Sequence, residues 1–113
     1  MNLVALMGNL TRDPETRIAE SGTSVTKFSI AVNEFRRKGE ESVASFFDCV
    51  AFGKTSELIQ TYFTKGKPIA VTGRLKQDRW NAEDGSNRSK ISIIVEKVDF
   101  VGFKEKEGDE PSY

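Results

Sequence analysis

An alternation of apolar and polar residues between Lys67 and Val95 restricts the fold of this chain more than any other feature. Successive side chains of a β-strand point to opposite faces, so alternate apolar positions share one face. In the first half of the stretch the expected inward positions are Ile69, Val71, Gly73 and Leu75. The intervening positions, on the opposite face, include Arg74, Lys76, Asp78 and Trp80. The pattern predicts a strand that is apolar on one face and basic and aromatic on the other.

Residues 81–87, which follow this strand, are rich in turn-forming residues and contain an Asp-Gly pair at Asp84-Gly85. We expect the chain to reverse there into a second strand, Ser89 to Val95. Its inward positions are again apolar: Ile91, Ile93 and Val95. Residues 67–95 therefore predict a long β-hairpin.

Trp80 is the only tryptophan of the chain and lies on the polar face near the tip of the predicted hairpin. A solvated strand face explains Arg74 or Lys76 taken singly. It explains an indole beside two cations less well, because large aromatic side chains normally enter the core. This face is therefore a candidate binding surface.

Length and composition limit the possible classes of protein. A chain of 113 residues, 37% hydrophobic and 30% charged, is typical of one globular domain. No apolar run approaches the roughly 20 residues needed to span a bilayer, and no signal-peptide pattern is present, so we expect a cytoplasmic protein without a membrane partner. One cysteine and no histidine leave too few ligands for a zinc site. The lack of histidine also removes the commonest general base and argues against an enzyme.

The net charge is zero, but the charges are unevenly distributed. Residues 65–90 contain seven basic and three acidic residues, a local charge of +4. Residues 104–113 contain two basic and four acidic residues, a local charge of −2. The hairpin is therefore the basic region, and the tail offsets part of its charge.

Three further strands are expected before the hairpin, at residues 2–7, 25–32 and 45–52. The first is a buried strand that ends at Gly8, and a loop at 9–14 follows it. Arg17 and Ile18 then restart an extended segment, which precedes a turn at 20–23. The core face of the second consists of Phe28, Ile30 and Val32. The third has Phe47, Cys49 and Ala51 for the core, which leaves Phe46 and Phe52 for the opposite face.

One helix is expected at residues 54–64, where Leu58, Ile59, Tyr62 and Phe63 form an apolar stripe that packs on the sheet. Thr55 or Ser56 is the expected cap, and Gly66 the expected C′ glycine. The charged loop at 33–42, with its Arg36-Arg37-Lys38 run, is either a solvated loop or a phosphate contact. After the hairpin, parity shifts to Val98 and Phe100, so we expect a β-bulge near Glu96-Lys97.

This order of elements predicts an all-β OB-fold, a five-stranded Greek-key barrel with one short helix between strands 3 and 4. The expected domain covers residues 1–103, and residues 104–113 form a short acidic tail that we expect to be disordered.

Several motifs, in order and spacing, resemble those of the bacterial-type single-stranded DNA-binding protein family between about Asn2 and Phe103. They are residues 8–15 followed by Arg17, 28–32, 50–54, 62–66, 73–75 and 79–80 (GNLTRDPE, FSIAV, VAFGK, YFTKG, GRL and RW). The resemblance implies an OB-fold homotetramer that wraps single-stranded DNA without sequence preference, in replication, recombination and repair, with no cofactor. Replication and repair proteins are further implied partners. The family's long linker and acidic, Phe-terminated tip are absent here, which gives no support for recruitment through the tail.

The resemblance also places the DNA-binding residues. Its base-stacking aromatics correspond to Trp80, Phe46 and Phe52, and Phe35 lies one place earlier than the family's loop aromatic. The cations assigned to phosphate contacts are Arg74, Lys76, Lys54, Arg12 and Arg36. Asp48 stands where many members have a basic residue, and we expect it to weaken phosphate attraction locally or to pair with a neighbouring Arg.

Assembly is suggested by residues whose parity leaves them outside one core. The first strand is apolar on both faces, with Leu3, Ala5 and Met7 on one side, and Ile94 has the opposite parity to its neighbours. One such face is expected to meet a partner. The resemblance implies a homotetramer of dimers that pair near their first strands.

Two other functions remain open. An OB-fold replication accessory protein of the primosomal type would use the same hairpin for protein contacts, because aromatics and Arg are also enriched in protein interfaces. A nucleic-acid enzyme would need Asp13, Asp48 and Asp78 to gather around magnesium, although they are scattered in the sequence.

Overall fold

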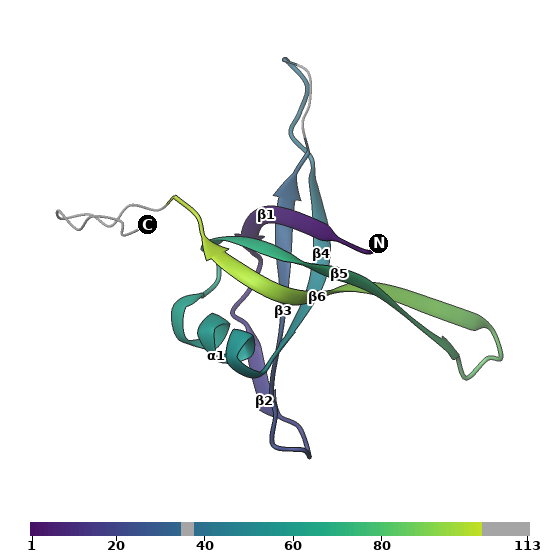
Figure 1. Ribbon diagram of the computed structural model, residues 1–113. Helices are drawn as coiled ribbons and strands as arrows, with labels where there is room; N and C mark the ends of the chain where they lie inside the picture. Colours follow the sequence, from purple (N-terminus) through teal and green to yellow (C-terminus); the bar gives the residue numbers. More distant parts are fainter. Residues whose placement is uncertain (35–37, 103–113) are drawn as a thin grey trace.

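The computed structural model describes residues 1–34 and 38–102, which form six strands and one helix (Figure 1). In chain order the elements are β1 (Val4–Leu10), β2 (Glu15–Ile18), β3 (Ser24–Asn33), β4 (Ala44–Phe52), α1 (Gly53–Tyr62), β5 (Pro68–Asn81) and β6 (Asn87–Phe100). No helix in this part of the chain is long and apolar enough to cross a membrane.

The strands form one sheet in the order β1-β5-β6-β4-β3-β2, and an additional pairing of β1 with β3 closes it into a barrel. The β4–β6 pairing is parallel, and the others are antiparallel. The helix lies between the third and fourth long strands, as predicted, so the barrel has the OB-fold arrangement. The four-residue β2, which pairs with β3, is a sixth strand beyond the five expected.

The core confirms most of the predicted inward positions. Its buried members come from five strands and the helix: Leu10, Phe28, Ile30, Cys49, Ala51, Ile59, Phe63, Ile69, Val71, Ile93 and Val95. Val32 and Phe47 are partly buried and pack against this cluster. Helix α1 packs against β3, β4 and β6 at one end of the barrel (Figure 1).

Strand β1 begins at Val4, later than predicted. It also ends later, because it continues through Gly8 to pair with β3 at Asn9 and Leu10. The glycine is required by a close approach of the two backbones. A Cβ atom at Gly8 would lie only 2.3 Å from the carbonyl oxygen of Ala31. The strand is also less buried than expected: its outward Met7 is 60% exposed, and Leu3, just before the strand, is 67% exposed.

The predicted bulge is confirmed. The register between β5 and β6 shifts between Thr72 and Gly73, which pair with Lys97 and Val95, so Glu96 has no partner in the ladder. Beyond this point β5 and β6 leave the barrel as a two-stranded arm that ends in a turn at Gly85, where φ is +86° (Figure 1).

Leu75 and Ile91 are 45% and 58% exposed, so the prediction that they face a core is wrong. They have the expected parity, but β4 pairs with β6 only from Ile93 to Val95. The arm therefore extends past the layers that would cover them. Ile94, which was expected to lie outside the core, is instead buried within this chain, at 8% exposure. Val50 and Arg74 pair with it on either side.

Helix α1 differs from the prediction at both ends. Its N-cap residue is Phe52, with no side-chain cap, and neither Thr55 nor Ser56 takes that role. The helix ends at Tyr62 with Phe63 as C-cap, so Gly66 is not its C′ residue. Gly66 instead donates its N–H to the carbonyl of Leu10, in a later turn where its φ of +88° favours glycine.

Tyr62 was expected in the core but is 54% exposed. It lies against the end of β6, where its ring meets Phe100 edge-on at a centroid distance of 5.6 Å. Phe63, the next residue, is buried and stacks on the same ring at 5.1 Å. The apolar stripe therefore continues through Phe63 and not through Tyr62.

Candidate nucleic-acid interface

The outer face of the barrel, defined here as the outward side of β2, β3, β4 and the β5–β6 arm, contains two of the predicted stacking residues on β4. Phe46 and Phe52 point outward and are 68% and 46% exposed. Their neighbours across the ladder on β3 are Ala31 and Val25, which are too small to cover the rings. Both phenyl faces therefore remain accessible.

A network of buried hydroxyl groups fixes the backbone behind Phe52. Thr26 on β3 bonds Ser56 of α1 at 2.6 Å, and Thr16 on β2 bonds Thr26 at 2.6 Å. Ser24 reaches the same Ser56 hydroxyl at 2.8 Å. Because Ser56 and Thr26 are fully buried, these bonds tie the start of α1 to the barrel. The role of Ser56 in the fold explains why it does not cap the helix.

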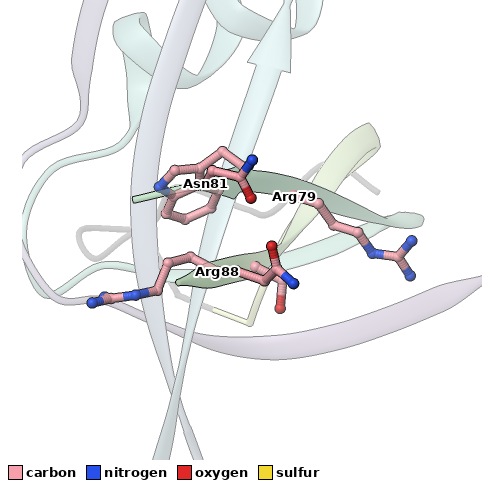
Figure 2. A pocket seen from close by; sticks show the side chains of 6 residues that line it. Arg79, Asn81 and Arg88 are labelled. Carbon is pink, nitrogen blue, oxygen red and sulfur yellow. The ribbon is translucent and has the colours of Figure 1, made fainter. Parts of the chain in front are cut away.

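Trp80 lies on the arm and is 49% exposed, which agrees with its predicted place on the polar side. It pairs across the hairpin with Arg88. The tip forms an open hollow lined by Arg79, Trp80, Asn81, Asn87, Arg88 and Ser89 (Figure 2). Figure 2 shows Arg79 and Arg88 extending in opposite directions, so cations flank the tip on both sides.

The turn at the tip is ordered by local hydrogen bonds. The Ser86 backbone N–H and hydroxyl donate to one oxygen of Asp84 at 2.9 and 2.6 Å. These bonds lower the pKa of Asp84, so the carboxylate stays charged and lies 3.7 Å from the guanidinium of Arg88.

The predicted cations Arg74 and Lys76 lie on the outer face of the arm, and each is paired with a carboxylate. Arg74 donates to Glu96 at 2.7 Å, and Lys76 donates to Asp78. Asp48, on β4, pairs with Lys90 of β6 at 3.3 Å. Asp48 was expected to weaken phosphate attraction or to pair with an Arg; its partner is Lys90, which the sequence reasoning did not single out.

Two more basic residues of this face were missed. The register aligns Arg17 of β2 with Val25 and Phe52, and it places Lys27 beside Val50. Arg17 and Lys27 also line a second hollow, and neither makes an ion pair with another residue in the described ranges. The alternation in residues 24–33 already put Lys27 outward, but nothing in the sequence aligned Arg17 with Phe52.

The remaining predicted positions are less tightly grouped. Lys54 is exposed in the first turn of α1, two residues after Phe52. Arg12 lies in the loop between β1 and β2, and not on the strands of the outer face. Phe35, Arg36 and residues 104–113 lie outside the described residues. The structure thus brings Phe46, Phe52, Arg74, Lys76 and Trp80 to one continuous side of the sheet.

The acidic residues considered for magnesium do not gather. Asp48 lies on β4 and Asp78 on the arm, while Asp13 accepts a hydrogen bond from the Lys65 N–H at 2.8 Å. Among residues 1–34 and 38–102, no group of three or more potential ligands can hold a metal ion. The free thiol of Cys49 is buried below the outer face, and burial, with the nearby charge of Asp48, raises its pKa to about 12.

An OB-fold barrel with accessible aromatics and cations on its outer face is typical of OB-fold proteins that bind single-stranded nucleic acids. The model of the Single-strand binding protein family matches residues 1–101, and the chain belongs to that family. The family is not enzymatic, so the prediction that the chain is not an enzyme is confirmed.

Curated relatives and a solved structure agree with this assignment. Single-stranded DNA-binding proteins of Clostridium perfringens and Treponema pallidum are 46% and 41% identical to the chain over 102 and 104 residues. These alignments cover 89% and 90% of this chain but 66% and 58% of the relatives, so the chain spans about three-fifths of their length. A structure described as Plasmodium falciparum SSB in complex with ssDNA is 28% identical, with a TM-score of 0.77, and covers 88% of this chain and 91% of that one.

Proposed function

We propose that this chain binds and protects single-stranded DNA without sequence preference, on the outer face of β3, β4 and the β5–β6 arm. The observation on which this rests is the set of three exposed aromatic rings, Phe46, Phe52 and Trp80, on one side of an OB-fold with cations around them. The names of the relatives, and the solved complex of a similar protein with ssDNA, support the same ligand.

The proposed mechanism needs no chemistry. Every base has a π-face, so stacking on Phe46, Phe52 and Trp80 tolerates any sequence and is worth about 1–3 kcal/mol per base. Arg74, Lys76, Lys54 and Arg12 are the proposed phosphate contacts, and Arg17 and Lys27 extend this set beside Phe52. Phe35 and Arg36 lie outside the described residues and stay predictions from the sequence. Binding should weaken with salt as counterions are released.

We assign binding to residues 1–103 as one domain. By family membership the proposed setting is the cytoplasm, at the nucleoid, in DNA replication, recombination and repair. Proteins of replication and repair are proposed partners.

The proposed assembly is a homotetramer. Met7 on β1, and Leu3 just before this strand, have exposed apolar side chains. Residues 4–8 of β1 pair only with β5, because β3 meets the strand at Asn9 and Leu10 alone. One edge of β1 is therefore open to a second copy. Static light scattering tests this: the mass of a tetramer is expected, Leu3→Glu/Met7→Glu should lower it, and a monomer at micromolar concentration would refute the assembly.

Fluorescence anisotropy with labelled oligonucleotides tests the function. The chain should bind dT and mixed-sequence single strands with similar affinity and the matching duplex far more weakly. Equal binding to duplex, or none to any strand, would refute the proposal.

The exposed Leu75 and Ile91 on the other side of the arm favour a second candidate, an OB-fold replication accessory protein that acts through protein contacts. In that case, the folded chain would not raise the anisotropy of any labelled single-stranded oligonucleotide.

A further inference from the structure

The basic residues on the outer side of the arm already have anionic partners within the chain. Arg74, Lys76 and Lys90 meet Glu96, Asp78 and Asp48, at separations of 3.3 Å or less. All six side chains are about half exposed, so a phosphate from solution can reach each pair. Single-stranded DNA that binds here competes with the carboxylates for the same cations.

Asp48 has a special place among these carboxylates, because it comes from β4, the strand that bears Phe46 and Phe52. It has the same outward parity as both rings. Residues two apart on a strand are about 7 Å apart, so the carboxylate lies between the two stacking positions and close to the first. A DNA strand whose bases stack on both rings must place its phosphates near this negative charge.

The ion pair of Asp48 joins two elements of the proposed interface. Asp48 is on the barrel, whereas Lys90 is on the arm, opposite Asp78 and two residues after Arg88, the partner of Trp80. When Asp48 holds Lys90, the cation faces the barrel strand and is less available to a phosphate. Phosphate binding at Lys90 then requires the exchange of one ionic partner for another.

We propose that Asp48 limits the affinity of the outer face for single-stranded DNA, by repelling phosphates between Phe46 and Phe52 and by occupying Lys90. The inference rests on the proposed function. Binding exchanges the Asp48 carboxylate for a phosphate at Lys90, and the freed carboxylate takes up a counterion from solution. Fewer ions are therefore released in total than the number of basic residues on the face would suggest.

The test is Asp48→Asn, which keeps the shape of the side chain and removes its charge. Asp99→Asn is the matched control: it changes the net charge equally, but its carboxylate pairs with Lys97 at 3.9 Å near the far end of β6. Binding of a labelled dT oligonucleotide is measured by anisotropy across a series of salt concentrations.

For Asp48→Asn we expect affinity at low salt to rise about two- to fivefold, the range of an exposed charge pair. The slope of log K against log salt should become steeper by about 0.7, the value for one added phosphate contact on a single strand. Asp99→Asn should change neither quantity comparably. In a Lys90→Ala background the gain in slope should disappear, because the freed cation is missing.

Three results would overturn the proposal: wild-type affinity and slope for Asp48→Asn, an equal effect of Asp99→Asn, or a gain in slope that persists without Lys90. In each of them the wild-type chain still binds dT, so the proposed function stands. A wild-type chain that binds no single strand would remove both. Thermal unfolding of the variants checks the fold, which an exposed pair should hardly affect.

Discussion

Replacement of Trp80 by Ala should separate binding from folding. Trp80 is 49% exposed on a two-stranded arm with no core beneath it, so removal of its ring should leave the stability of the barrel nearly unchanged. The loss of one base-stacking surface should cost about 1–3 kcal/mol of binding free energy. At 1.4 kcal/mol per factor of ten, this is a loss of about 5- to 150-fold in affinity.

The assay uses the anisotropy of a labelled dT oligonucleotide, because the variant lacks the only tryptophan. Tyr62→Ala is the matched control: Tyr62 is exposed to a similar extent, at 54%, but it lies on α1 against Phe100 and away from the outer face. The control should lose about 0.5–1.5 kcal/mol of folding stability from the ring contact and keep its DNA affinity. Trp80→Phe should retain much of the affinity. Wild-type affinity in folded Trp80→Ala would refute the reasoning.

Three further predictions concern charge, packing and ionisation. Lys76→Ala should weaken binding about equally for every sequence and make the salt slope shallower by up to about 0.7; a loss confined to one base composition would contradict phosphate contact. Gly73→Ala should lower the free energy of unfolding by about 1–3 kcal/mol or more, because a Cβ would lie 1.9 Å from the carbonyl oxygen of Ile94; an unchanged urea midpoint would show that the bulge can absorb the methyl group. Burial raises the pKa of Cys49 from 9.0 to about 12, so its thiol stabilises the fold fully below pH 9 and progressively less as pH rises to 12. Urea unfolding at pH 8 and pH 10.5 should show this decline, and the decline should be smaller in Cys49→Ala.

The alternation of residues along β4 was sufficient to predict which of its faces points into the core. Phe47, Cys49 and Ala51 form the smaller, uncharged set of one parity, and the barrel buries or partly buries this set while it leaves Phe46 and Phe52 exposed. The same rule placed Trp80 outward and located the bulge near Glu96. These features depend on neighbours along the chain, so local patterns contain them.

Features that depend on where a layer ends were not predictable in the same way. Leu75 and Ile91 have inward parity, yet they lie beyond the end of the β4–β6 pairing and meet no core. Ser56 is typical of a helix cap in sequence, but the buried hydroxyls of Ser24 and Thr26 bind it instead. The partner of Asp48 depends on the register of two strands about 40 residues apart in the chain.

The most direct test of DNA binding on the outer face follows the intrinsic fluorescence of Trp80 while poly-dT is added. Because the chain has one tryptophan, the signal reports on a single proposed stacking site. If bases stack on Trp80, poly-dT should cause strong, saturable quenching. Poly-dA should also quench, duplex DNA should not, and added salt should reverse the effect. Unchanged fluorescence at poly-dT concentrations that saturate binding by anisotropy would show that no base stacks on Trp80, and would contradict the proposed mode of DNA binding.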